Sequence, residues 1–158
     1  MESNVIQFVM CDFTNPVHVE HFLELQRAYM TDPMGDVAPH SPEKEETLIS
    51  KLQAHQEAFQ LFAKLGDAYI GLANCFYGFS TFSAKKLINI HDLVVLPDYR
   101  DLGVGRKMLE EIARIGRKKD CCKITLEVRQ DNERGKHLYK SEGFKDCDPP
   151  MHFWYKSL

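Results

Sequence analysis

The fold is decided by the stretch Leu93-Val94-Val95-Leu96-Pro97-Asp98-Tyr99-Arg100-Asp101-Leu102-Gly103-Val104-Gly105-Arg106. Its first four residues are apolar and predict a strand that stops at Pro97. A turn with two glycines follows, and glycine lets a ligand approach the backbone because it has no Cβ atom. The helix that comes next begins with N–H groups that have no partner within the helix and lie at the positive end of its dipole. This order of strand, turn and helix predicts a site for a phosphate group.

The turn does not match the loops that bind common nucleotides. It lacks the Lys-Ser/Thr pair that ends a nucleoside-triphosphate loop, and its glycines are not spaced as in the dinucleotide motif Gly-x-Gly-x-x-Gly. Taken alone, Gly103 and Gly105 are equally consistent with a turn that needs glycine only for its geometry. The choice between a ligand site and a plain turn depends on the sequence downstream.

The helix after the turn is predicted over 103–117, because apolar residues recur there at helical spacing. A strand is predicted over 87–95 before the turn and another over 123–128 after the helix, where apolar and polar residues alternate. Strand, helix and strand form a right-handed βαβ unit, so the two strands should run parallel. Ligands of such sheets bind at the carboxyl ends of the strands, where the glycine turn lies.

The rest of the chain completes an α+β fold, or α/β in a looser sense, around a mixed sheet. The pairs Asn15-Pro16 and Ser41-Pro42 each combine an N-cap residue with proline at the first helical position. The remaining predicted elements are a strand at 5–11, helices at 16–30 and 41–55, a hairpin of strands at 59–65 and 69–79, a helix at 131–142, and short strands near 144 and over 151–156.

The composition is that of one globular domain. The chain has 158 residues, 44% apolar and 27% charged, and its net charge of -3 gives no general reason to bind nucleic acid or an anionic membrane. No apolar stretch approaches the ~20 residues that span a bilayer. Five cysteines at irregular spacing favour free thiols in a reducing compartment, so we expect a cytoplasmic protein. No Cys/His cluster has zinc spacing, and no metal is predicted.

A second group of residues on the predicted helix at 131–142 complements the turn. Asn132, Gly135 and Tyr139 lie three and four residues apart and therefore share one helix face. Glycine inside a helix costs ~1 kcal/mol relative to alanine, so close approach of another surface would justify Gly135. The alternative for Tyr139 is a core aromatic residue whose hydroxyl is satisfied.

Three pieces of the run 93–144 together resemble the cofactor-binding half of the GNAT superfamily N-acetyltransferases. Arg100-Asp101-Leu102-Gly103-Val104-Gly105 is similar to the family's Arg/Gln-x-x-Gly-x-Gly/Ala pyrophosphate loop. Leu126-Glu127-Val128-Arg129, followed by Asn132, resembles the strand and helix start of members that acetylate protein N-termini. Leu138-Tyr139 with Gly143-Phe144 resembles the helix that ends beneath the thioester.

The resemblance implies a GNAT-like fold over 1–158: a mixed, largely antiparallel central sheet with a parallel, splayed strand pair and helices on both faces. It implies that this single acyl-CoA N-acyltransferase domain takes acetyl-coenzyme A (acetyl-CoA) as donor. The acceptor would be a primary amine of a small molecule or peptide that attacks directly in a ternary complex. The resemblance is also compatible with a homodimer.

The same resemblance assigns roles in donor binding. Backbone groups of the strand end would pair with the pantetheine arm as though it were another strand, the glycine turn would hold the pyrophosphate, and Asn132 would bind pantetheine or reach the acceptor. The residues assigned to the donor are Leu93, Val94, Val95, Arg100, Asp101, Leu102, Gly103, Val104, Gly105, Arg106, Asn132 and Tyr139.

Acetyl transfer has three chemical requirements. An alkylammonium with a pKa near ~10 must lose a proton before it attacks. The tetrahedral oxyanion needs a donor, which the backbone N–H of Leu93 or Val94 could supply. The departing thiolate is helped by a proton donor, for which Tyr139 is the candidate.

Three residues compete for the role of base. Glu127 lies on the polar face of its predicted strand and matches a family position that sometimes accepts the proton, but a surface carboxylate is an equal interpretation. His91 and Asp92 are the rivals, with a buried polar pair that fixes strand geometry as the alternative. Strict alternation places Asp92 on the face of Ile90 and Val94, where a charge is costly. A β-bulge, as in family members, would redirect it.

The acceptor itself is not identified by the sequence. The resemblance assigns its choice to 29–46, 76–82 and 151–155; carboxylates in the first segment could attract a cationic amine, although solvated carboxylates explain them as well. A non-catalytic module that senses acyl-CoA is the main rival function, and Tyr139 together with Glu127 favours the enzyme. A plain nucleotide-phosphate binder would need a lysine that the turn lacks.

Overall fold

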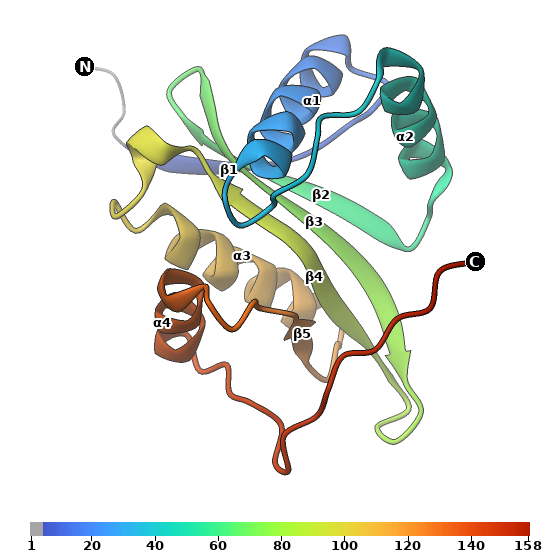
Figure 1. The fold of residues 1–158 in the computed structure, drawn as a ribbon, viewed down its shortest axis with the longest axis vertical. Helices are drawn as coiled ribbons and strands as arrows, with labels where there is room; N and C mark the ends of the chain where they lie inside the picture. Colours follow the sequence, from blue (N-terminus) through green and yellow to red (C-terminus); the bar gives the residue numbers. More distant parts are fainter. Residues whose placement is uncertain (1–4) are drawn as a thin grey trace.

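The strands lie side by side in the order in which the chain makes them. The computed structural model describes residues 5–158. Along the chain the elements are β1 (Ile6–Met10), α1 (Pro16–Thr31), α2 (Pro42–Ala54), β2 (Ala58–Leu65), β3 (Ala68–Ser80), β4 (Lys85–Val95), a 3-10 turn η1 (Pro97–Tyr99), α3 (Val104–Lys118), β5 (Ile124–Leu126) and α4 (Glu133–Ser141) (Figure 1). The sheet order is β1-β2-β3-β4-β5, and β4–β5 is its one parallel pair in the described part of the chain.

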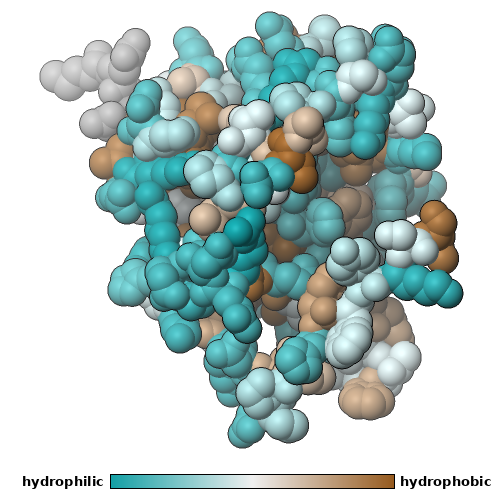
Figure 2. Space-filling view, in the orientation of Figure 1, coloured by the Kyte–Doolittle hydropathy of each residue, from teal (hydrophilic) through white to brown (hydrophobic). Residues whose placement is uncertain are grey.

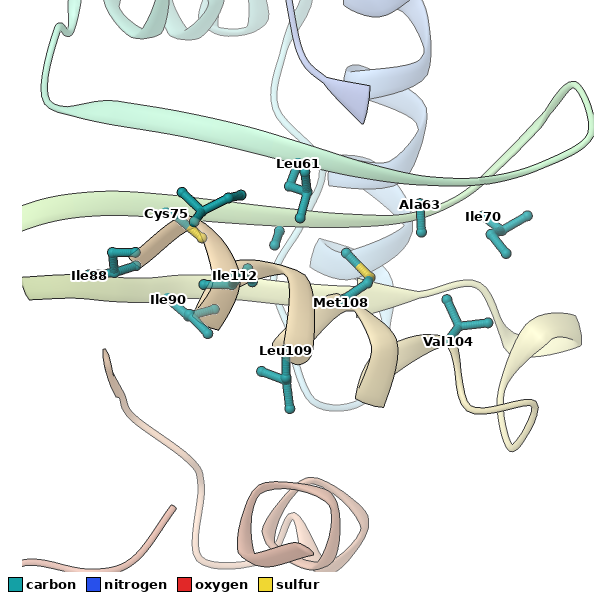
Figure 3. Packing of buried hydrophobic residues seen from close by; sticks show 12 residues of the cluster. Leu61, Ala63, Ile70, Cys75, Ile88, Ile90, Val104, Met108, Leu109 and Ile112 are labelled. Atoms are coloured by element: carbon teal, nitrogen blue, oxygen red, sulfur yellow. The ribbon is translucent and has the colours of Figure 1, made fainter. Parts of the chain in front are cut away.

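Helices cover both faces of this sheet and create two cores (Figure 1). On one face α1 buries Phe22 and Leu25 against Phe62, Leu72 and Val94. On the other face α3 packs its apolar stripe against β2, β3 and β4 (Figure 3). The predicted fold class is therefore confirmed: a mixed, largely antiparallel sheet with a parallel pair and helices on both faces.

The stripe on α3 follows the spacing that predicted the helix. Val104, Met108, Leu109 and Ile112 are all buried, and Figure 3 shows them beneath the strands. Each such side chain contributes about 1.5–3 kcal/mol when it is removed from water. This packing fixes the first turn of α3 against the end of β4.

The two N-terminal helices begin as predicted. The side chain of Asn15 accepts a hydrogen bond from Val17 N–H (3.0 Å), and Ser41 Oγ accepts one from Lys44 N–H (3.3 Å). Each cap satisfies a donor that the first helical turn leaves without a partner. Proline follows each cap at the start of the helix.

A β-bulge in β4 corrects the expectation from strict alternation. Asn74 pairs with Asp92 and Cys75 with Ile90, so His91 is an extra residue on β4. The extra residue reverses the facing of every position that follows it. Ile90 lies in the core beneath α3, whereas Val94 lies in the core beneath α1. Asp92 consequently faces the side of α1, as Val94 does, and points away from the core beneath α3.

The C-terminal third departs from the prediction. The strand predicted over 123–128 is limited to β5, which pairs with Ile88–Ile90 alone, and the two short strands predicted near 144 and over 151–156 are absent from the described structure. A strand needs a neighbouring edge for its backbone groups, and β5 offers an edge of only three residues. Residues 145–158 are exposed, and Figure 2 shows hydrophobic atoms at the surface where the chain ends. None of the helices described over 5–158 is both long and apolar enough to cross a bilayer.

Candidate functional site

A first cavity opens where β4 and β5 part. Their parallel pairing ends at Ile90 and Leu126, and the two chains then diverge. The cavity has a volume of about 370 Å³ and lies between β4, the glycine turn, the segment after β5, and α4. It collects every residue that the sequence assigned to the donor except Leu102, whose side chain is exposed.

The open edge of β4 borders this cavity. Leu96 N–H donates to Ile70 O (2.9 Å), which places the backbone groups of Leu96 on the β3 side. Because backbone groups of a strand alternate between its two edges, those of Val94 also face β3. Leu93 and Val95 therefore present theirs to the open edge, where no strand pairs with them in the described structure.

The glycine turn presents free N–H groups to the same cavity. Asp101 (φ 61°) and Gly103 (φ 77°) adopt left-handed backbone conformations that turn the chain sharply into α3. Hydrogen bonding along the helix begins with Lys107 N–H, which donates to Gly103 O (3.1 Å). Within residues 5–158, no acceptor faces the N–H groups of Val104 to Arg106. They lie at the positive end of α3 and favour an anion.

Gly105 allows α4 to approach α3 closely. A Cβ atom at this position would lie 3.0 Å from Leu138 Cδ2 and 4.0 Å from Val95 Cγ2. All three residues line the first cavity. A larger side chain at Gly105 must therefore displace α4 or enter the cavity.

Arg100 is held by protein groups. Its Nε donates to Val95 O (2.8 Å), and its Nη2 donates to Asp32 Oδ2 (2.6 Å). Asp32 Oδ1 in turn accepts from Met34 N–H (2.9 Å). Burial favours the neutral acid, but the hydrogen bonds from Arg100 and Met34 outweigh it and lower the pKa of Asp32. The Asp32–Arg100 pair thus ties the loop after α1 to the end of β4.

Two other arginines line the first cavity, and about half of each side chain is exposed. Arg106 contacts Glu142 (3.3 Å), and Arg134 contacts Asp101 (3.1 Å). The Arg134–Asp101 pair is exposed on both sides and therefore weak, so the Arg134 guanidinium can turn toward an anion at small cost, whereas Glu142 in the other pair is only 15% exposed. Arg134 was not among the residues predicted from the sequence. The sequence did contain a signal for Arg134: it is a basic residue in the first turn of the helix that begins at Asn132, which was already assigned to the site.

The helix face of Asn132, Gly135 and Tyr139 is formed, but Gly135 has a different reason from the one expected. Asn132 is the N-cap of α4 and accepts from Gly135 N–H through Oδ1 (2.8 Å). A Cβ atom on Gly135 would lie 2.7 Å from the Nδ2 of that same asparagine. The surface that approaches Gly135 is therefore the capping side chain itself.

Tyr139 is the half-buried phenol of this face. Burial, and then the neighbouring Tyr29, raise its pKa to about 12. Its ring lies edge-on to Phe144, with centroids 5.9 Å apart. The hydroxyl is therefore protonated at neutral pH and able to donate. Glu127, by contrast, is exposed at the cavity wall, just beyond the end of β5.

A second cavity of about 400 Å³ adjoins the first. It lies between α1, α2, the loop after α1, β3 and β4, and it shares Tyr29, Met34 and His91 with the first cavity. Its complete lining is Phe22, Gln26, Tyr29, Met30, Met34, Gly35, Val37, His40, Leu48, Leu52, Asn74, Phe76, His91 and Asp92. Asp92 belongs to this cavity and does not line the first.

The segments predicted to choose the acceptor contribute unequally. The segment 29–46 supplies six lining residues of the second cavity, whereas 76–82 supplies Phe76 alone and 151–155 supplies none. The helix α2 is held over this cavity by Arg27 of α1, which makes two hydrogen bonds to Glu45 (2.6 and 2.5 Å). Among the residues described, no three His, Cys, Asp or Glu side chains are grouped as a metal would require.

The Acetyltransferase (GNAT) family matches this chain over residues 19–144, a span that includes every residue that lines the two cavities. The chain belongs to the GNAT family. This confirms the resemblance found in the glycine turn, in the strand that leads to Asn132 and in the helix that ends before Gly143.

Relatives and solved structures agree with this assignment. The GNAT chain is 31% identical over 81 residues to thialysine N-epsilon-acetyltransferase of Bos taurus, a match that covers 51% of this chain and 47% of the relative. It is 25% identical over 109 residues to an uncharacterized N-acetyltransferase of Bacillus subtilis, which covers 69% and 72%. The chain thus spans about half the length of the first relative and more of the second.

The fold is shared with solved acetyltransferases at low sequence identity. An aminoglycoside acetyltransferase from an uncultured soil sample superposes with a TM-score of 0.82 at 18% identity, over 100% of both chains. A second aminoglycoside acetyltransferase, solved with a bisubstrate analogue that contains coenzyme A, gives a TM-score of 0.78 at 16% identity over 98% and 99%. At such identities the likeness shows the GNAT fold alone, and the predicted fold is confirmed.

Proposed function

We propose that this GNAT protein transfers the acetyl group of acetyl-CoA to a primary amine of a small molecule or peptide, by direct attack in a ternary complex. The observation that carries the proposal is the junction of the two cavities. One cavity offers free backbone N–H groups and an open strand edge. The other offers a chamber lined mostly by apolar side chains, and the two meet at Tyr29, Met34 and His91.

The first cavity suits the donor. Free N–H groups at the start of α3 would bind the pyrophosphate, with Arg106 and Arg134 as positive charges in the cavity wall. The pantetheine amides would pair with the open edge of β4 at Leu93 and at the N–H of Val95, whose carbonyl already accepts from Arg100. Arg100 would hold the end of β4 in place and not bind the donor itself, because its guanidinium already donates to Val95 O and to Asp32.

The second cavity would deliver the amine to the shared wall. The nitrogen lone pair forms the new C–N bond and pushes the carbonyl electrons onto oxygen, where the N–H of Leu93 would stabilise the negative charge. Collapse of this intermediate breaks the C–S bond, and the thiolate takes a proton from Tyr139. The proton lost by the amine would go to Glu127 or Asp92, which lie in the walls of the first and second cavities respectively.

The named relatives support the reaction class. A thialysine N-epsilon-acetyltransferase is among them, which is consistent with an amine at the end of a flexible chain as acceptor. Cytoplasmic location and a homodimer stay predictions from the sequence.

Two measurements test the proposal. Calorimetric titration should show acetyl-CoA binding to the purified protein, and thiol release should follow addition of some members of a panel of primary amines. A protein that binds acetyl-CoA but releases no thiol with any amine would contradict catalysis. A protein that does not bind acetyl-CoA would contradict the donor site.

A further inference from the structure

The floor of the second cavity holds a polar group of three side chains. Asn74 is 5% exposed, and its Nδ2 donates to Gln26 Oε1 (2.8 Å) and to Asp92 Oδ2 (2.7 Å). Because a carboxylate only accepts, the nitrogen of the amide must be the atom that faces Asp92. Both hydrogens of that nitrogen are therefore used.

The same group has more acceptors than donors. Asn74 Oδ1 is buried without a hydrogen-bond partner, and a buried oxygen in this condition is unfavourable until a donor reaches it. Asp92 takes part in no ion pair among the described residues. The two arginines of this region are bound elsewhere, Arg27 by Glu45 and Arg100 by Asp32. Among the described residues, the floor thus holds a carboxylate outside any ion pair and an amide oxygen that no donor reaches, although Gln26, His40 and His91 also line the cavity.

The negative charge extends to the junction of the cavities. Burial raises the pKa of Tyr29, and the charge of Asp92 raises it further. Tyr29 lines both cavities, whereas Asp92 and Asn74 line the second alone. The reacting end of an acceptor belongs at the shared wall, so the floor is left for a different part of the molecule.

The walls between the floor and the junction are apolar. They include Phe22, Met30, Leu52 and Phe76. An alkyl spacer would be removed from water against these side chains. A primary ammonium supplies three donors and one positive charge, which match the unpaired oxygen and the carboxylate at the floor.

We propose that the acceptor is a dibasic amine, whose far ammonium binds between the Asp92 carboxylate and Asn74 Oδ1 while its other amino group attacks at the shared wall. The assignment of the reacting end rests on the proposed acetyl transfer. Asp92 is then a specificity-determining residue, and Glu127 is left to accept the proton of the attacking nitrogen.

The test compares diaminobutane with butylamine by calorimetry, with coenzyme A bound so that no turnover occurs. The wild-type protein should bind the diamine about 10-fold or more tightly than the monoamine, the gain expected from one charge-assisted hydrogen-bonded contact. Asp92→Asn and Asn74→Leu should each reduce that ratio toward unity. Asp67→Asn removes a carboxylate from the exposed β2–β3 turn, far from the floor, and should leave the ratio unchanged.

Two results would overturn the inference: equal binding of both amines to the wild-type protein, or an undiminished ratio in Asp92→Asn. Thermal melts followed by circular dichroism ensure that each variant is folded, and Asp92→Asn nearly preserves side-chain shape. Thiol release from acetyl-CoA is measured separately with the same two amines. Absence of release together with a diamine preference that depends on Asp92 would contradict acetyl transfer and leave the ammonium site intact.

Discussion

The first and second cavities are assembled from different kinds of sequence. Most of the first comes from two local runs, the end of β4 with the turn into α3, and the end of β5 with α4. Its chemical groups are largely backbone N–H groups at Val104 to Arg106 and along an open strand edge. The second collects single side chains from α1, α2, a loop and two strands. A backbone site can therefore be recognised along the chain, whereas a side-chain site emerges only from the packing.

The largest expected effect tests whether the two cavities meet at the reacting atoms. Tyr139→Phe removes the proton donor and should lower kcat about 100-fold or more, since general acid catalysis contributes 10²–10⁴-fold. The affinity for acetyl-CoA should stay within a few-fold, because the backbone contacts are untouched. Steady-state kinetics beside calorimetry measure both. Because the pKa of Tyr139 is about 12, its ionisation should produce no decline in rate near neutral pH. Unchanged kcat would exclude this phenol from the reaction.

The next largest effect tests whether the two cavities bind their ligands independently. Gly105→Leu places a side chain where Leu138 already approaches closely, and it should weaken acetyl-CoA binding about 10- to 100-fold, the range expected from overpacking by ~1–3 kcal/mol. Amine binding in the second cavity should be nearly unaffected. Titration of each ligand alone distinguishes the two outcomes. Equal loss of both affinities would mean that the cavities are not independent.

A smaller effect concerns the Asp32–Arg100 ion pair, which joins the loop after α1 to the end of β4. Asp32→Asn breaks the half-buried pair with Arg100, in which the side chains are 14% and 28% exposed, and should cost ~1–3 kcal/mol of unfolding free energy at neutral pH. The folded pKa of Asp32 is lowered, so its contribution is present above the ordinary carboxyl pKa and is lost as pH falls through the folded value. Urea titrations at neutral and acidic pH should therefore converge for wild type and variant in acid. A constant difference at every pH would contradict this account.

The smallest effect is expected at the C-terminus. Residues 151–158 line neither cavity and are exposed, so their removal should change the unfolding free energy by no more than about 0.5 kcal/mol. Acetyl-CoA affinity should be unchanged. Gel filtration of the full and shortened chains also tests the predicted homodimer. A large loss of stability or of donor binding would show that this segment has a role beyond its exposed position.

The sequence predicted well what local patterns determine. The caps at Asn15 and Ser41, the apolar stripe on α3 and the glycine turn before it each follow from residues close in the chain. The resemblance of the turn and of α4 to a family then located most of the first cavity. These features need no knowledge of which segments meet in space.

The remaining features depend on pairing and packing. The bulge at His91 shows only in the register with β3, and strict alternation alone gave the wrong face for Asp92. The strand predicted over 151–156 has a suitable pattern, but β5 at that side of the sheet offers an edge of only three residues. Asn74 appeared as an ordinary strand residue, because its contacts come from α1 and β4. Such polar groups are visible only once distant segments are brought together.

Because of the extra residue at position 91, Ile88 and Ile90 of β4 face the core beneath α3, whereas Val94 faces the core beneath α1. Deleting residue 91 would leave Ile90 opposite Cys75 and Asp92 opposite Asn74 in a regular ladder, so both side chains would keep their present faces. Replacing the imidazole by another side chain would also leave both faces unchanged. A regular strand that retained residue 91, by contrast, would turn the carboxylate of residue 92 toward Met108 and its neighbours, at a cost of several kcal/mol for an uncompensated charge.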